Sequence, residues 1–224
     1  MHLWFRFLRS ALNLRILRGV QVDRVELPRL GCDARFTTGF QSMKTLRRFA
    51  ADPVNGMSPH FVRDAVRNGD ACYAVCDGAT LASSAWYSTR PTPIGTPGLV
   101  LHFAPGYVYM YKGLTCEAYR GQRLYAVGIS RALAHYTAQG ARGFVSYVEA
   151  TNRASMKAAL RMGFRVFGSV YLIRLFGRHF AFSSPGCRAF GFRLETTRLV
   201  QRASRRDRPK RFNAPRAHAH IPVV

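Results

Sequence analysis

The stretch YRGQRLYAVGI, residues 119–129, carries residue types that can bind phosphate. Arg120 and Arg123 flank Gly121, and apolar residues begin to recur at helical spacing directly afterwards. The first turn of a helix leaves backbone amides unpaired and carries a partial positive charge, so a diphosphate can bind there. An arginine side chain can add a bidentate contact. The same spacing also occurs in ordinary strand-to-helix turns, so this stretch alone leaves both interpretations open.

A second polar signal lies in VEATNRASMKAALRMGF, residues 148–164. Asn152 is suited to cap a short helix, because its side chain can accept a hydrogen bond from a free amide of the first turn. Gly163 follows at the position where helices commonly end. The pattern therefore predicts a capped helix directly after a strand.

Carboxylates that could act as a general base are scarce, since the chain has 11 acidic residues against 34 basic ones. Glu149 ends one expected strand and Glu117 ends another. A partly desolvated glutamate in either place could accept a proton from an attacking ammonium, worth about 10²–10⁴-fold in rate. The other interpretation is a salt bridge to an arginine. For Glu117 the salt bridge is favoured, and for Glu149 the two interpretations have equal weight.

Other reactive side chains give weaker signals. His102 and Tyr109 lie in expected strands, where packing is the usual role of such residues. Cys116 is a nucleophile in principle, but no histidine partner can be identified from the sequence. The five cysteines are scattered and none forms a CxxC pair, so neither a disulfide framework nor a zinc site is predicted.

Periodicity and turn residues predict the elements that position these groups. The order is β-αα-βββ-α-β-α-ββ, which describes a mixed sheet with helices on its faces. The strands on either side of the helix at 122–139 are expected to be parallel neighbours, because a right-handed crossover joins them. The expected strands are 21–30, 71–76, 80–88, 99–115 with a break at 105–106, 143–150, and a final hairpin of 164–176 with 187–195; the expected helices are 37–52, 58–69, 122–139 and 153–162.

The net charge of +23 is extreme and unevenly distributed. Residues 1–20 form a basic segment without acidic residues, and residues 198–224 are expected to be a disordered basic tail. A single folded domain is expected between them, over residues 21–197. A charge distribution of this kind attracts polyanions such as nucleic acid, anionic lipid or a ligand with several phosphates.

Targeting signals are not evident in the sequence. No stretch reaches the roughly 18 uninterrupted apolar residues of a membrane span. Arginines at positions 6, 9, 15 and 18 interrupt any apolar region of a signal peptide. We therefore expect a cytoplasmic protein without a transmembrane segment.

Taken together, LTCEAYRGQRLYAVGISRAL and VEATNRASMKAALRMGFRVFG resemble the two central motifs of the GNAT superfamily of acetyl-CoA-dependent N-acetyltransferases. The likeness covers residues 107–168, and the element order of 21–195 agrees with that fold. The resemblance implies an α/β (α+β) single domain with a GNAT-like mixed, largely antiparallel central sheet flanked by helices. It also implies acetyl-CoA as co-substrate, with no metal, and coenzyme A contacts from Thr115, Cys116, Arg120, Gly121, Gln122, Arg123, Leu124, Tyr125, Ala126, Asn152 and Ser155.

The chain departs from the family pattern at several of these positions. The first motif, Q/R-x-x-G-x-G/A, begins at Arg120, so Arg123 replaces its glycine and Tyr125 its small sixth residue. Arg123 can still donate its backbone N–H if its φ is negative. A tyrosine that protonates the departing thiolate in many family members corresponds here to Ala159, and a frequent proline corresponds to Glu117.

The resemblance implies an acyltransferase that moves an acetyl group from acetyl-CoA to a primary amine by direct attack. Glu149 and Glu117 are its candidate general bases, and a backbone N–H near residues 115–117 would polarise the thioester carbonyl. The alternative is a non-catalytic acyl-CoA- or nucleic-acid-binding protein on a GNAT fold, which would bind nucleic acid through residues 198–224 by counterion release. The fold does not identify the acceptor, and the sequence leaves the oligomeric state open.

Overall fold

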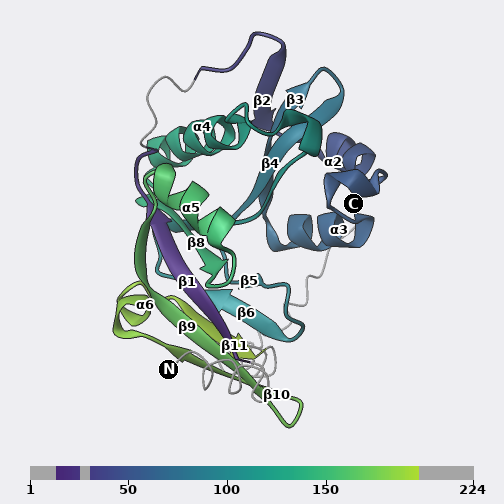
Figure 1. The fold of residues 1–224 in the computed structure, drawn as a ribbon. Helices are drawn as coiled ribbons and strands as arrows, with labels where there is room; N and C mark the ends of the chain where they lie inside the picture. Colours follow the sequence, from purple (N-terminus) through teal and green to yellow (C-terminus); the bar gives the residue numbers. More distant parts are fainter. Residues whose placement is uncertain (1–13, 26–30, 197–224) are drawn as a thin grey trace, which may run out of the picture.

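A computed structural model describes residues 14–25 and 31–196, which form two β-sheets with helices packed against them (Figure 1). The large sheet has the strand order β10-β9-β1-β8-β7-β4-β3-β2, and the small sheet has the order β11-β6-β5. The strands of the large sheet are β1 (Arg15–Val22), β2 (Phe36–Phe40), β3 (Ala71–Asp77), β4 (Thr80–Ser88), β7 (Tyr107–Thr115), β8 (Gly143–Glu149), β9 (Arg165–Leu175) and β10 (Arg178–Ser183); those of the small sheet are β5 (Thr92–Pro93), β6 (Leu99–His102) and β11 (Arg193–Thr196). The helices are α2 (Met43–Ala50), α3 (Pro59–Asn68), α4 (Leu124–Ala138), α5 (Arg153–Arg161) and α6 (Pro185–Ala189), with short 3-10 turns at Pro53–Asn55 and Glu117–Tyr119.

The central pair β7 and β8 is parallel, whereas the other paired strands of the large sheet are antiparallel. The predicted mixed, largely antiparallel sheet and the parallel neighbours around α4 are therefore confirmed. The β7–β8 pairing runs only from Tyr107 opposite Gly143 to Tyr109 opposite Val145. Beyond these residues each strand continues without pairing to the other, so the sheet opens between them.

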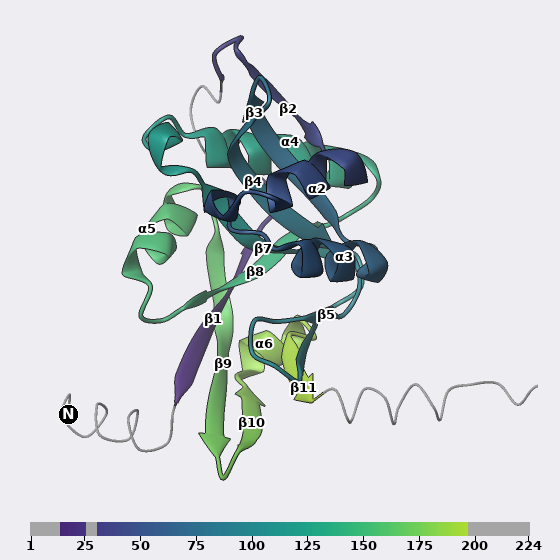
Figure 2. The same ribbon diagram turned by 90° about the vertical axis from the view of Figure 1, so that its right-hand side faces the viewer.

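Helices cover both faces of the large sheet (Figure 2). On one face α4 and α5 bury a core that includes Ile129, Phe144 and Phe164. On the other face α2 and α3 bury a second core around Phe49 and Trp86. The small sheet and α6 pack against β1, β7, β8 and β9 through a third cluster. The opening between β7 and β8 therefore lies between two different sets of helices.

Capping residues set the ends of the helices beside the opening. Ser58 caps α3 through its side chain, which accepts a hydrogen bond from the N–H of Phe61 at 3.1 Å, and Gly69 ends α3 at a φ of +85°. The positive φ is costly for residues with a β-carbon, so glycine suits this position. The predicted helix at 58–69 is confirmed.

The predicted beginning of the chain is wrong in two places. The first strand spans Arg15–Val22 rather than 21–30, and it lies inside the sheet between β8 and β9. Residues 15–20 were predicted to belong to the basic N-terminal segment rather than to the folded domain, but Arg18 donates a hydrogen bond to the hydroxyl of Ser169 at 2.9 Å. Residues 37–40, predicted as helix, belong to β2 instead. β-branched and aromatic residues favour a strand, and the helix begins only after its cap at Ser42.

The predicted final hairpin is also wrong in its second strand. β9 pairs with β10, which follows directly after a turn at Gly177, whereas residues 187–195 contain the end of α6 and β11. β11 pairs with β6 in the small sheet. The predicted break at 105–106 within the strand region 99–115 is confirmed, and the two strands that it separates, β6 and β7, belong to different sheets.

The predicted basic tail at 198–224 and most of the predicted N-terminal segment lie outside the described residues. Within the residues that the structure describes, no helix is long and apolar enough to cross a membrane.

Candidate functional site

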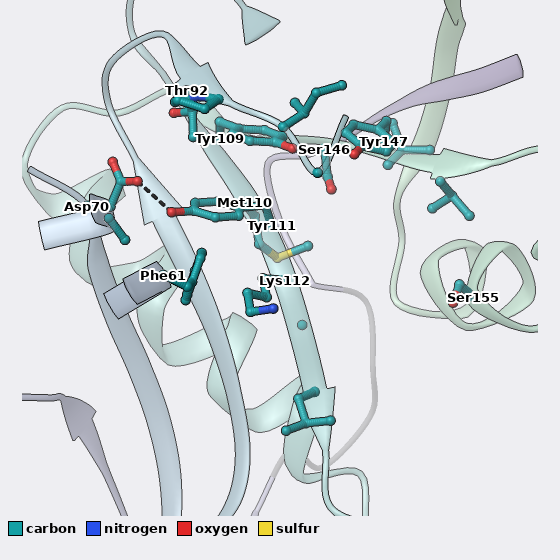
Figure 3. A pocket seen from close by; sticks show the side chains of 18 of the residues that line it. Phe61, Asp70, Thr92, Tyr109, Met110, Tyr111, Lys112, Ser146, Tyr147 and Ser155 are labelled. Carbon is teal, nitrogen blue, oxygen red and sulfur yellow. Dashed lines mark hydrogen bonds between the residues drawn. The ribbon is translucent and has the colours of Figure 1, made fainter. Parts of the chain in front are cut away.

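A cavity of about 1010 Å³ lies where β7 and β8 part (Figure 3). One side is formed by α3 and the residues that follow it, and the other side by α5. Residues 92–95, 109–115 and 146–148 also line the cavity, as do Val20, Tyr125, Met162 and Phe164. Because the two strands are unpaired here, the cavity is lined from both faces of the sheet.

A β-bulge shapes the wall that β7 contributes. Lys112 has a φ of +49°, and the pairing of β4 with β7 shifts register beside it. Tyr111 and Lys112 both contact the ring of Phe61 on α3: the two rings lie 6.2 Å apart, and the Lys112 ammonium lies 4.6 Å from the centroid. Successive side chains of a regular strand point to opposite faces, so the bulge turns both toward α3.

The predicted phosphate-binding turn stands at the start of α4. Arg123 precedes the helix with a φ of +58° and makes no side-chain cap, and Gly121 has a φ of +83°. A negative φ at Arg123 was required for this residue to replace glycine in an ordinary conformation. The structure shows a positive φ instead. The residue instead adopts the left-handed conformation that glycine favours. No heavy atom lies within 4 Å of a β-carbon built on Gly121, so space beside the turn is open.

The predicted cap of α5 is confirmed, and it places the helix against the cavity. The side chain of Asn152 accepts a hydrogen bond from the N–H of Ser155 at 3.0 Å. Ser155 and Ala159 both line the cavity. The position that carries a tyrosine in many GNAT proteins is therefore in contact with the cavity, but it offers a methyl group.

The predicted coenzyme A contacts fall into three groups. Thr115, Tyr125 and Ser155 line the cavity. Burial raises the pKa of Tyr125 to about 12, so its phenol stays protonated at neutral pH. Arg120, Gly121, Gln122, Arg123 and Asn152 lie on the surface, whereas Cys116, Leu124 and Ala126 are buried in the hydrophobic core.

Neither predicted general base lines the cavity. Glu149 forms an ion pair with Arg15 at the beginning of β1. Glu117 lies 3.7 Å from a guanidinium nitrogen of Arg120, and its side chain is 89% exposed. Both glutamates therefore form salt bridges to arginine, which was the alternative interpretation of each. Glu117 is exposed and so lacks the desolvation that would raise its basicity.

The structure also shows where the weaker candidates Cys116, His102 and Tyr109 lie. The N–H of Cys116 donates to the carbonyl of Ala82 at 3.0 Å, so it is not free to polarise a thioester carbonyl. Burial raises the pKa of its thiol, which disfavours the nucleophilic thiolate. His102 lies beside Glu195 in the small sheet rather than in the cavity. Tyr109 does line the cavity, where its ring stacks on that of Tyr111 at 5.2 Å.

The sequence interpretation missed Asp70, a carboxylate in the cavity wall whose residue is 7% exposed. The hydroxyl of Tyr111 donates a hydrogen bond to its Oδ2 at 2.5 Å, and Asn68 Nδ2 donates to its Oδ1 at 2.9 Å. Burial, followed by this hydrogen bond, raises the pKa of Tyr111. Asp70 directly follows the glycine that ends α3, where an exposed turn residue would be expected. Its contact with Tyr111 joins residues distant in the chain, so no local pattern could reveal it.

In residues 14–25 and 31–196, no group of three or more His, Cys, Asp or Glu residues could hold a metal ion.

No known family model and no curated protein sequence matches the chain. Solved structures do resemble it. A crystal structure of a protein from Novosphingobium aromaticivorans, assigned to the GNAT acetyltransferases, aligns with a TM-score of 0.52 at 18% identity, over 82% of this chain and 66% of that one. An X-ray structure of a Drosophila protein aligns with a TM-score of 0.51 at 11% identity, over 79% of this chain and 57% of that one.

This chain thus spans less than two thirds of the length of either structure. At these identities the likeness concerns the fold. The chain has the fold of the GNAT acetyltransferases, as its two motifs predicted.

Proposed function

We propose that this protein binds acetyl-CoA at the start of α4 and transfers the acetyl group to a primary amine held in the cavity between β7 and β8. The observation that carries the proposal is the cavity itself. It reaches both faces of the sheet at the point where the strands part, and Tyr125 in the first turn of α4 lines it. Two substrates can therefore enter from opposite faces and meet between the strands.

The residues at the start of α4 fit a diphosphate. The helix begins without a side-chain cap, so its first amides are free to donate to phosphate oxygens. Gly121 leaves open space beside the turn, and the exposed side chains of Arg120 and Arg123 add positive charge. Together these features support binding of coenzyme A by the predicted motif despite its missing glycine.

Acetyl-CoA supplies an activated acetyl group in the form of a thioester. The chain's own contribution is to hold an amine beside it, since orientation of two reactants supplies much of the rate in such transfers. A backbone donor for the carbonyl is better sought at the bulge of Lys112 than at Cys116, whose N–H is bound to Ala82. A bulge leaves backbone groups unpaired with the neighbouring strand.

We assign proton transfer to side chains that line the cavity. The positions of Glu149 and Glu117 do not support a role as general base, because both are ion-paired outside the lining. Tyr125 and Ser155 are hydroxyl donors on the side of α4 and α5, where Ala159 has none. The buried carboxylate on the opposite side is Asp70.

The proposal is tested by titrating the full-length protein with acetyl-CoA in a calorimeter, and by following release of free thiol when amines are added. Arg120→Gln is expected to weaken acetyl-CoA binding several-fold, as the loss of a charge-assisted contact to phosphate would. Arg178→Gln, in β10, removes the same charge far from α4 and serves as the matched control. Its affinity should equal that of the wild type.

The possible outcomes separate the two hypotheses. Binding with thiol release supports the acyltransferase. Binding without thiol release, over a broad set of amines, supports the non-catalytic acyl-CoA-binding protein. No heat of binding at millimolar acetyl-CoA and low salt would overturn both and leave nucleic-acid binding as the remaining hypothesis.

A further inference from the structure

We propose that Asp70 binds the ammonium group of a small amine, and that the part of the cavity between α3 and β7 is the acceptor site. That the bound amine accepts an acetyl group rests on the proposed function. That Asp70 binds a cation is independent of the proposed function, because it follows from the carboxylate of Asp70 and its burial.

Asp70 is a buried carboxylate without a counter-ion among the residues that the structure describes. Across residues 14–25 and 31–196, it is the only acidic residue that is buried. Other carboxylates, such as Glu149 and Asp77, lie beside an arginine, whereas no ion pair with a described basic residue involves Asp70. Burying a carboxylate is costly unless it is paired, so a site that keeps one facing a cavity favours a cationic ligand.

The carboxylate of Asp70 is held in one orientation, and only part of its hydrogen-bonding capacity is used. Tyr111 donates to one oxygen and Asn68 to the other, and these contacts hold the group in place. An ionised carboxylate has about four acceptor positions, so about two remain for a ligand. An ammonium group carries three donors and can use both of them.

The wall of the cavity near Asp70 is rich in aromatic side chains. The rings of Tyr109 and Tyr111 are stacked within 4° of parallel, and Phe61 and Tyr147 also line the cavity (Figure 3). Aromatic faces attract cations and also bury apolar carbon. The wall therefore suits an amine with an aromatic or aliphatic body.

The charges that face this part of the cavity are balanced, unlike those of the molecule as a whole. Asp64 and Asp70 line it together with Arg67 and Lys112, and His60 lies 3.1 Å from Asp64. The chain as a whole carries +23. A strongly basic surface repels amines, so a cavity that includes a buried acid provides the local attraction that the surface lacks.

The test uses phenethylamine and benzylamine as probes, with 2-phenylethanol and benzyl alcohol as their neutral counterparts. Binding to the full-length protein is measured by ligand-observed NMR at neutral pH. We expect each amine to bind about tenfold more tightly than its alcohol, as a hydrogen-bonded charge pair would give. Equal binding of amine and alcohol by the wild type would overturn the proposal without any variant.

Asp70→Asn keeps the shape of the side chain and removes its charge, and it should abolish the preference for amines. Asp64→Asn is the matched control: it also removes an acid that lines the cavity, but one whose side chain is 53% exposed, and it should keep the preference. A preference retained by Asp70→Asn, or lost equally in Asp64→Asn, would contradict the assignment.

Titration with acetyl-CoA separates this inference from the proposed function. Asp70→Asn should bind acetyl-CoA as the wild type does, because its hydrogen-bond partners are Asn68 and Tyr111 rather than the turn at the start of α4. If the wild type prefers amines but does not bind acetyl-CoA, the cation site stands and the acetyl transfer fails. If it binds acetyl-CoA without preferring amines, only the acceptor site is wrong.

Discussion

The phenol of Tyr125 lies directly against the α-carbon of Gly113. A β-carbon added to Gly113 would lie 2.1 Å from Tyr125 Oη and 2.6 Å from Cζ, which is far inside contact distance. Tyr125 belongs to the first turn of α4, and Gly113 follows the bulge of β7. The contact therefore joins the predicted phosphate-binding turn to the wall of the cavity.

Gly113→Ala is expected to destabilise the protein by about 1–3 kcal/mol, because the rigid phenol ring cannot yield without moving α4 or β7. Chemical denaturation of the two proteins measures the difference. In a Tyr125→Ala background the same substitution should cost less than about 0.5 kcal/mol, since the clashing ring is gone. Equal costs in both backgrounds would show that Gly113 is required for another reason.

Arg123→Gly should leave the protein as stable as the wild type or more stable by up to about 1 kcal/mol. The left-handed conformation costs a residue with a β-carbon about 1–2 kcal/mol, and the greater freedom of glycine in the unfolded chain offsets part of that gain. Arg123→Ala keeps the strain and should show no gain. Both variants should bind acetyl-CoA about three- to tenfold more weakly in calorimetry, because both lose the guanidinium. Unchanged affinity would mean that Arg123 only tolerates the position.

Asn152→Ala is expected to lower the free energy of unfolding by about 1 kcal/mol, because the N–H of Ser155 loses its side-chain acceptor. Thermal unfolding followed by circular dichroism measures the effect. Asn152→Ser retains a capping oxygen and should recover most of the stability. We also expect Asn152→Ala to weaken acetyl-CoA binding, because the cap orients the helix that lines the cavity. Unchanged acetyl-CoA affinity in both variants would show that the cap matters only for folding.

Glu149→Gln and Glu117→Gln should each release thiol at a rate within about threefold of the wild-type rate. Loss of a general base would lower that rate by about 10²–10⁴-fold. The reason is that both side chains are ion-paired outside the cavity. Steady-state rates over a range of pH provide the measurement. A loss of about 100-fold or more in either variant, with acetyl-CoA affinity intact, would restore that glutamate as the base.

Sequence patterns identified those parts of the fold that depend on neighbouring residues. Ser58, Asn152 and Gly69 determine helix ends through contacts within a few residues, and each acts as predicted. Patterns failed where distant pairing decided the outcome. Residues 15–20 were assigned to a basic segment outside the folded domain, yet they form an inner strand because partners on β8 and β9 accommodate the arginines.

The sequence by itself determined most of the order of elements between residues 58 and 176, the turn before α4 and the cap of α5, because all of these follow from local hydrogen bonding and apolar periodicity. Only the tertiary structure decided the chemistry of the cavity. It paired Glu149 with Arg15 and brought Asp70 to Tyr111. Such contacts depend on where the chain returns in space, and their energies come from burial and charge pairing, which no local pattern encodes.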